Sequence, residues 1–195
     1  MTPAVDLLRT RGIAHVLHEY DHDPATPSYG LEAAEKLGVD PGRVFKTLLV
    51  RLDNLQLAVA VVPVSGQLNL KRMAKACAAR KAAMADTENV QRATGYVPGG
   101  VSPLGQKRLL RTVIDATAAD HETVFVSGGR RGLDVEQPRL MACRRADLGD
   151  AAAHEATADD ADLLDHHARS EEHRGGKEYT DQSSASHGKR GELGA

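Results

Sequence analysis

Two nearly continuous apolar segments stand near the middle of the chain, at residues 44–50 and 56–63. Valine, leucine and alanine dominate both segments, a pattern typical of strands that are buried on both faces of a sheet. Asp53 and Asn54 lie between the segments, and this polar pair predicts a turn that joins them as a hairpin. We therefore expect these residues to form the middle of a sheet.

Amphipathic segments with helix-ending residues surround this hairpin. Thr2 is followed by Pro3, as at the start of a helix, and Gly12 marks the end of that helix. Gly38 and Gly95 end two later segments in the same way. The expected helices cover residues 3–11, 29–37, 68–79 and 87–93.

Shorter segments with strand-like patterns alternate with these helices. They cover residues 14–20, 82–84, 109–115 and 123–126, and a glycine-rich turn is expected over residues 127–134. Strands and helices mixed along the chain predict an α+β (mixed α/β) fold.

The composition changes after Glu136. Residues 151–195 carry ten Asp and Glu against five Lys and Arg, with few large apolar side chains. Such a segment buries too little surface to offset the entropy of ordering. We therefore expect one domain over residues 1–149 and a disordered, acidic, histidine-containing tail over residues 150–195.

Charge and cysteine content narrow the cellular setting. The whole chain has a net charge of -2, but residues 1–150 carry 20 basic and 17 acidic residues. A slightly basic body permits contact with a nucleic acid. The N-terminus lacks the pattern of a signal peptide, and no apolar run reaches the ~18 residues of a membrane span. We expect a soluble cytoplasmic protein in which Cys77 and Cys143 are reduced.

A glycine- and proline-rich stretch at residues 95–105 is the first candidate for chemistry. Glycine allows close approach to the backbone, and proline stiffens the loop. A stiff loop of this kind can present backbone N–H groups to a carbonyl oxygen or a phosphate. An ordinary surface turn has the same composition and remains the alternative.

Three side chains have both a structural and a functional interpretation. Lys46 lies among aliphatic residues of a predicted strand, where it either extends to solvent at the strand end or positions a carbonyl or phosphate. Asp134 and Ser102 lie in glycine-rich loops, where each is either a turn residue or part of a site. Ser102 is not in a Gly-x-Ser-x-Gly motif, so a hydrolase nucleophile is not expected.

The patterns of known cofactor sites are missing. His15, His18 and His22 lie close together, but their spacing does not suggest a metal site. The sequence has neither a Walker A motif nor Gly-x-Gly-x-x-Gly. We expect no metal and no cofactor.

Several ordered blocks together resemble the YbaK-type Cys-tRNA(Pro) deacylases. The resemblance covers about residues 1–136, and the blocks are residues 1–5, 20–24, 44–48, 63–68, 84–86, 95–96 with 99–105, and 126–134. It implies a barrel-like mixed β-sheet surrounded by helices, related to the editing domain of prolyl-tRNA synthetase. It also implies a trans-editing enzyme that removes cysteine from mischarged tRNA(Pro), and from tRNA(Cys) as a further substrate.

The resemblance also implies which residues form the site. The catalytic group would comprise Lys46, Gly99, Gly100 and Pro103, and the substrate-binding group Tyr20, Ser102, Ser127, Gly128, Gly129 and Asp134. In the family, the thiol of the substrate cysteine attacks the ester carbonyl and leaves a cyclic thiolactone and free tRNA. No protein nucleophile is then required.

Two alternatives stay open at this level. Besides this deacylase, the chain is compatible with an editing enzyme for another small aminoacyl group. It is also compatible with a non-catalytic module that docks on tRNA or a synthetase. The modest positive charge of the body predicts weak binding to tRNA alone, so prolyl-tRNA synthetase is the expected partner. After Glu136 the sequence departs from the family, and a shift of reading frame in the gene is our hypothesis for that change.

Overall fold

The structure, a computed structural model, describes residues 1–138. Its helices are α1 (Pro3–Thr10), α2 (Tyr29–Leu37), α3 (Leu70–Ala76) and α4 (Thr87–Thr94), with the 3-10 turns η1 (Pro41–Arg43) and η2 (Ala116–Asp120). Its strands are β1 (Val16–Glu19), β2 (Val44–Leu52), β3 (Leu57–Pro63), β4 (Ala82–Met84), β5 (Arg111–Ile114), β6 (Thr123–Arg130) and β7 (Leu133–Pro138). None of the described helices is long and apolar enough to cross a membrane.

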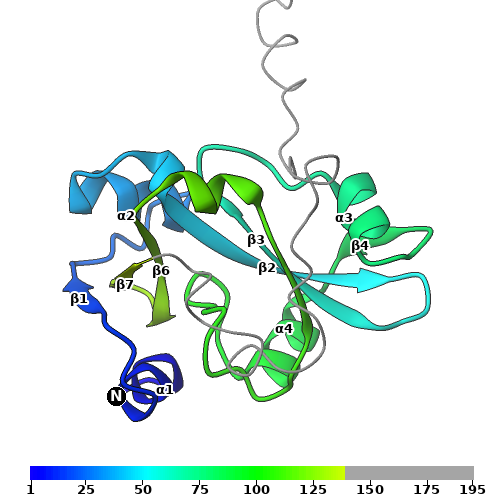
Figure 1. Cartoon of the computed structure of the whole chain (residues 1–195), viewed down its shortest axis with the longest axis horizontal. Helices are drawn as coiled ribbons and strands as arrows, with labels where there is room; N and C mark the ends of the chain where they lie inside the picture. The colour runs from blue at the N-terminus through cyan, green and yellow to red at the C-terminus, as the bar shows by residue number, and fades with distance from the viewer. Residues whose placement is uncertain (139–195) are drawn as a thin grey trace, which may run out of the picture. The chain divides into compact units, whose positions relative to one another are not determined.

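All seven strands belong to one mixed sheet, which confirms the predicted α+β class (Figure 1). The strand order is β1-β7-β6-β2-β3-β5, and β4 pairs with β2 outside this path. The pairs β2/β6 and β3/β5 are parallel, and the remaining pairs are antiparallel. Helix α2 packs against β2, and α1 packs against β6.

The predicted hairpin is confirmed as the centre of the sheet. Strands β2 and β3 are antiparallel, with Lys46 opposite Val62. Val59 and Val61 pack into one apolar cluster, whereas Ala58, Ala60 and Val62 pack into another. Strand β3 is therefore buried on both faces, as its continuous apolar sequence predicts.

The predicted ends of α1, α2 and α4 are also confirmed, whereas the helix expected over residues 68–79 is shorter and covers only Leu70–Ala76. The hydroxyl of Thr2 accepts a hydrogen bond from the N–H of Val5, and Asp86 caps α4 through the N–H of Asn89. Gly38 and Gly95 end α2 and α4 in the left-handed conformation, with φ of 66° and 80°. These contacts are local in sequence, which is why the residue types alone reveal them.

The broad turn predicted at residues 127–134 is wrong in extent. Strand β6 continues through Ser127 to Arg130, and only Arg131 and Gly132 form the turn. The register between β6 and β7 shifts between Ser127 and Arg130, where Gly129 has a φ of +97°. The glycines thus make a bulge inside a strand, because they tolerate the backbone that an extra residue imposes.

The expected tail over residues 150–195, the boundary at residue 149 and Cys143 lie outside the described residues. The same holds for the segment after residue 138 to which the frame-shift hypothesis applies.

Candidate active site

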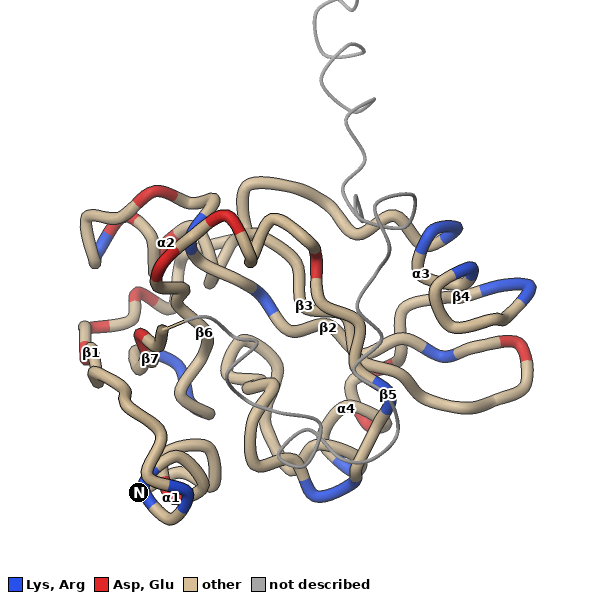
Figure 2. Tube along the Cα trace, in the orientation of Figure 1, with Lys and Arg blue, Asp and Glu red and all other residues tan. Residues whose placement is uncertain are grey.

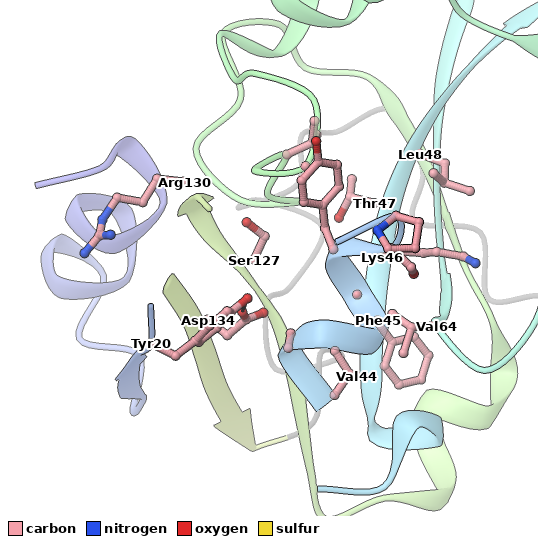
Figure 3. A pocket seen from close by; sticks show the side chains of 17 residues that line it. Tyr20, Val44, Phe45, Lys46, Thr47, Leu48, Val64, Ser127, Arg130 and Asp134 are labelled. Atoms are coloured by element: carbon pink, nitrogen blue, oxygen red, sulfur yellow. Dashed lines mark hydrogen bonds between the residues drawn. The ribbon is translucent and has the colours of Figure 1, made fainter. Parts of the chain in front are cut away.

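A cavity of about 280 Å³ opens beside β2 (Figure 3). Its walls come from the start of α2, the first half of β2, the glycine-proline loop and the paired strands β6 and β7. The lining residues are Tyr20, Pro27, Ser28, Tyr29, Gly30, Ala33, Val44, Phe45, Lys46, Thr47, Leu48, Val64, Gly99, Val101, Ser127, Arg130 and Asp134.

The cavity lies where, within residues 1–138, part of one edge of β2 has no neighbouring strand. Strand β6 pairs with β2 only at Val44 and Phe45. On the same edge, the short strand β4 begins to pair only at Val50 and continues to Leu52. The intervening stretch of β2, which includes Lys46 and Thr47, therefore borders a gap in the sheet and lines the cavity.

Lys46 projects from this gap into a partly buried setting. Its Nζ donates a hydrogen bond of 2.5 Å to the carbonyl oxygen of Gly66. Burial of the ammonium group lowers the pKa of Lys46 below its ordinary value. The side chain is thus not one that simply reaches solvent at a strand end: Lys46 lines the cavity, and its ammonium group is held against the carbonyl of Gly66.

Tyr20 and Asp134 form the opposite wall (Figure 3). The hydroxyl of Tyr20 donates a hydrogen bond of 3.0 Å to Oδ2 of Asp134. Asp134 is only 6% exposed, and this burial raises the pKa of its carboxyl to about 6, although the bond from Tyr20 and the nearby His18 act to lower it. Burial and the neighbouring carboxylate raise the pKa of Tyr20, so its hydroxyl stays protonated at neutral pH.

The glycine-proline loop closes the cavity through two close approaches. Gly99 has a φ of +83°, and a Cβ on it would lie 2.8 Å from ring atoms of Tyr29. A Cβ on Gly100 would lie 2.9 Å from Cα of Arg130. These positions therefore require glycine, which supports the interpretation of the loop as part of a site rather than as an ordinary surface turn.

The loop is held in place by Arg131 of the β6–β7 turn. Its Nε and Nη2 donate hydrogen bonds of 3.1 and 3.0 Å to the carbonyl oxygen of Pro98. Its guanidinium carbon also lies 4.9 Å from the ring centroid of Tyr29. The N–H of Gly100 is used within the loop, since it donates to the carbonyl of Val97. Within residues 1–138, the N–H groups of Gly99 and Val101 donate no hydrogen bond.

The structure brings five of the ten predicted site residues to the cavity. These are Tyr20, Lys46, Gly99, Ser127 and Asp134. The other five do not line it: Gly100, Ser102, Pro103, Gly128 and Gly129. They lie in the loop or in the bulge that shape its walls.

Ser102 has the structural role that was its alternative interpretation. Its side chain is fully buried, and its Oγ accepts a hydrogen bond of 3.2 Å from the N–H of Leu104. Gly128 accepts a hydrogen bond from the hydroxyl of Thr2 through its carbonyl oxygen. A Cβ on Gly129 would lie 2.7 Å from the ring of Tyr96. These residues fix the loop and the bulge against the body of the domain.

Sequence reasoning missed Tyr29, Thr47 and Arg130 as cavity residues. Tyr29 was recognised only as the start of a helix, and Arg130 only as part of a turn. Oγ1 of Thr47 is buried and has no hydrogen-bond partner within residues 1–138. The position of Thr47 directly after Lys46 was the only signal for it, because the gap at the edge of β2 is a property of the tertiary structure.

The three N-terminal histidines have separate partners. His15 contacts the carbonyl of Ile13, His18 contacts Glu136 at 3.0 Å, and His22 contacts Glu32 at 2.8 Å. Within residues 1–138, no group of three or more His, Cys, Asp or Glu side chains has an arrangement that could hold a metal ion.

Comparison with known proteins relates this architecture to translation. The model of the family described as the aminoacyl-tRNA editing domain matches residues 23–136, more than half of the chain. A candidate Cys-tRNA(Pro)/Cys-tRNA(Cys) deacylase, EbsC of Enterococcus faecalis, is 38% identical over 103 residues, which are 53% of this chain and 63% of that protein. A proline–tRNA ligase of Shouchella clausii is 36% identical over 76 residues, which are 39% of this chain and 13% of the ligase. The chain thus spans less than two thirds of the length of either relative.

Solved structures share the fold. The crystal structure of the hypothetical protein APE2540 superposes with a TM-score of 0.64 at 25% identity, over 72% of this chain and 91% of that one. A candidate trans-editing enzyme for prolyl tRNA synthetase superposes with a TM-score of 0.60 at 24% identity, over 70% of this chain and 84% of that one. The mixed sheet with its flanking helices is therefore an arrangement known from solved structures.

Proposed function

Because the chain belongs to the aminoacyl-tRNA editing domain family, we propose that it is a trans-editing deacylase that removes cysteine from mischarged tRNA(Pro). Cys-tRNA(Cys) is the second proposed substrate. The relative from Enterococcus faecalis is named as a candidate deacylase of both substrates, which supports this choice.

One observation carries the proposal: a lysine and a buried aspartate line the same small cavity, next to a loop that requires glycine. An aminoacyl ester has a cationic α-amino group and a polar carbonyl. Asp134, once ionised, is suited to hold the ammonium, and Lys46 is suited to hold the ester carbonyl or the terminal phosphate. The N–H groups of Gly99 and Val101 are suited to stabilise the oxyanion that develops on the carbonyl.

In the proposed reaction the substrate supplies its own nucleophile. The cysteinyl sulfur forms a bond to the carbonyl carbon, the ester bond to the ribose oxygen breaks, and the thiol proton passes to that oxygen. The products are a cyclic thiolactone and tRNA with a free terminal hydroxyl. The protein's Cys77 is no competitor, because it is buried in an apolar cluster and burial raises the pKa of its thiol.

Prolyl-tRNA synthetase is the proposed partner. The similarity to a proline–tRNA ligase and to a candidate trans-editing enzyme for the synthetase supports this proposal. A partner of this kind would bring mischarged tRNA to the domain before cysteine is passed on to translation.

Release of labelled cysteine from Cys-tRNA(Pro) tests the function. The wild-type chain, Lys46→Ala and Lys36→Ala are compared, with folding checked by circular dichroism. Lys36 is the matched control because it is exposed on α2 and does not line the cavity. We expect fast release by the wild type and by Lys36→Ala, and a loss of at least about 100-fold in Lys46→Ala.

Two outcomes would overturn the proposal. A folded wild type that leaves Cys-tRNA(Pro) intact but deacylates another aminoacyl-tRNA would reassign the substrate. A folded wild type that binds tRNA or the synthetase without deacylating any substrate would identify a docking module.

A further inference from the structure

Positive charge is concentrated in the middle of the chain. Residues 41–111 carry twelve Lys and Arg but only three Asp and Glu. Between Asp53 and Asp86 there is no acidic residue, whereas five basic residues lie in that interval. The net charge of -2 for the whole chain conceals this local excess.

The fold gathers these five basic residues on one part of the surface. Helix α3 buries Met73, Ala74 and Ala76 against the sheet and exposes its basic side chains. The turn that follows α3 adds two more before β4 begins. Figure 2 shows Lys and Arg on α3 and on the segment that leads to β4. We call this the α3–β4 basic surface; its residues, all exposed, are Lys71, Arg72, Lys75, Arg80 and Lys81.

Asp53 lies beside this surface, and its carboxylate has a structural role. Oδ2 of Asp53 accepts a hydrogen bond of 3.0 Å from the N–H of Arg80, and the N–H of Asp53 donates to the carbonyl of Lys81. These contacts hold the turn between α3 and β4 against the β2–β3 hairpin. The basic side chains thus lie on a fixed part of the backbone.

Strand β2 connects this surface to the cavity. Lys46 lines the cavity, and Leu52 at the other end of β2 pairs with Ala82, the neighbour of Lys81. Leu52 lies six positions after Lys46 along the strand, a path of about 20 Å at about 3.3 Å per residue. If the single-stranded 3′ end of a tRNA is inserted into the cavity, the adjoining duplex reaches a part of the surface at about this distance.

We propose that the α3–β4 basic surface binds the phosphate backbone of the tRNA acceptor stem while the aminoacyl end occupies the cavity. The inference rests on the proposed function and extends it to a separate part of the molecule. Long basic side chains on a helix and its following turn match a row of phosphates by charge alone, without reading sequence. Binding of this kind is modest at physiological salt and depends steeply on salt concentration.

Binding of uncharged tRNA tests the proposal without any chemical step. In the test variant, Lys71, Arg80 and Lys81 are each changed to Gln, which keeps helix propensity close to that of Lys. In the control variant, Arg9, Lys36 and Arg92 are changed to Gln. This control removes the same charge from exposed positions of α1, α2 and α4. Fluorescence anisotropy with labelled tRNA is measured between about 50 and 200 mM salt.

We expect the test variant to bind tRNA at least about 10-fold more weakly at low salt, with a salt slope reduced by about 3. The control variant should keep the wild-type slope. For deacylation of Cys-tRNA(Pro), the test variant should raise KM and leave kcat unchanged. For a cysteinyl ester of adenosine, which has no stem, the two variants and the wild type should be alike.

Equal tRNA affinity of the test variant, the control variant and the wild type would overturn the proposal. Weaker binding of the test variant to prolyl-tRNA synthetase, with tRNA binding unchanged, would assign the surface to an acidic protein partner instead. These results are separate from the proposed function: a misassigned surface leaves deacylation intact, and a misassigned activity leaves the anisotropy measurement interpretable.

Discussion

The hydroxyl of Tyr20 donates a hydrogen bond of 3.0 Å to Oδ2 of Asp134, across 114 positions of sequence. Tyr20 directly follows β1, and Asp134 lies in β7, so the contact depends on the pairing of these strands. The bond helps the buried carboxylate to ionise and fixes its orientation on the cavity wall. It therefore ties the charge of the candidate site to pH.

The stability of the domain should fall as Asp134 ionises. Its pKa of about 6 in the folded chain lies above the ordinary value of 3.8, so the folded state binds this proton more tightly than the unfolded state. Stability then decreases as the pH rises from about 4 to about 6 and stays level above that range. We expect Asp134→Asn to gain about 2–3 kcal/mol relative to the wild type between pH 4 and pH 7, as measured by urea unfolding. A constant difference between the two proteins over this range would contradict the raised pKa.

The pH dependence of activity should move when Tyr20 is changed. If ionised Asp134 holds the substrate ammonium, kcat/KM rises with pH through about 6. Tyr20→Phe removes a bond that favours ionisation, so the acidic limb should shift to higher pH. The measurement is kcat/KM for Cys-tRNA(Pro) between pH 5 and 8, with Asp134→Asn as the variant that should lose the limb. An unchanged limb in Tyr20→Phe would place the titrating group elsewhere.

Gly99→Ala should lower the stability of the domain by more than the strain of a positive φ alone. A new Cβ would meet the ring of Tyr29 at 2.8 Å, in addition to the strain of a φ of +83°. Gly12→Ala is the matched control, because Gly12 has a φ of +63° with nothing within 4 Å of the added carbon. We expect a loss of about 1 kcal/mol in the control and about 2–3 kcal/mol in Gly99→Ala, by urea unfolding.

Removal of the Tyr29 ring provides a second check on this loop. In a protein that already carries Tyr29→Ala, Gly99→Ala should lower stability by less than it does in the wild type. The clash with the ring is then gone, and only the φ strain remains. Strictly additive losses would show that the loop, rather than the ring, moves away from the new carbon.

Glu32→Gln should destabilise the domain at neutral pH and not in acid. The carboxylate of Glu32 accepts hydrogen bonds from the N–H of Asp23 and from Nδ1 of His22. Its burial raises the pKa, but these bonds outweigh burial and the net pKa is lowered. A lowered pKa adds stability above the ordinary value of 4.5, and that stability is lost as the pH falls through the folded value.

We expect Glu32→Gln to lose about 1–2 kcal/mol at pH 7, because a neutral amide replaces a charged acceptor. The gap from the wild type should narrow steadily below pH 4.5 in urea unfolding series. A difference in stability that stays constant down to pH 3 would mean that the shape of the side chain, not its charge, causes the loss. Tyr29 lies beside His22, with ring centroids 5.3 Å apart, so loss of activity in the same variant would connect this contact to the cavity.

Residue order alone determined the local features of this protein. Thr2, Gly38 and Gly95 mark helix ends because capping depends on groups only a few positions away. The middle strands of the sheet are recognisable because burial on both faces requires an unbroken apolar segment. Lys46 stands out for the same reason, as a charge inside such a segment.

The tertiary structure decided which of these residues meet. Lys46 and Asp134 line one cavity because β2 parts from β6 after Phe45 and, among the described strands, none pairs with the next residues of that edge. Because of that gap Thr47 also lines the cavity, and Tyr29 lines it because α2 packs against β2. Ser102, in contrast, is turned into the interior by its own loop. Helix caps and apolar periodicity depend on residues that are close in sequence, so the sequence reveals them. A cavity is the space left between elements, and that space depends on how strands that are distant in sequence pair.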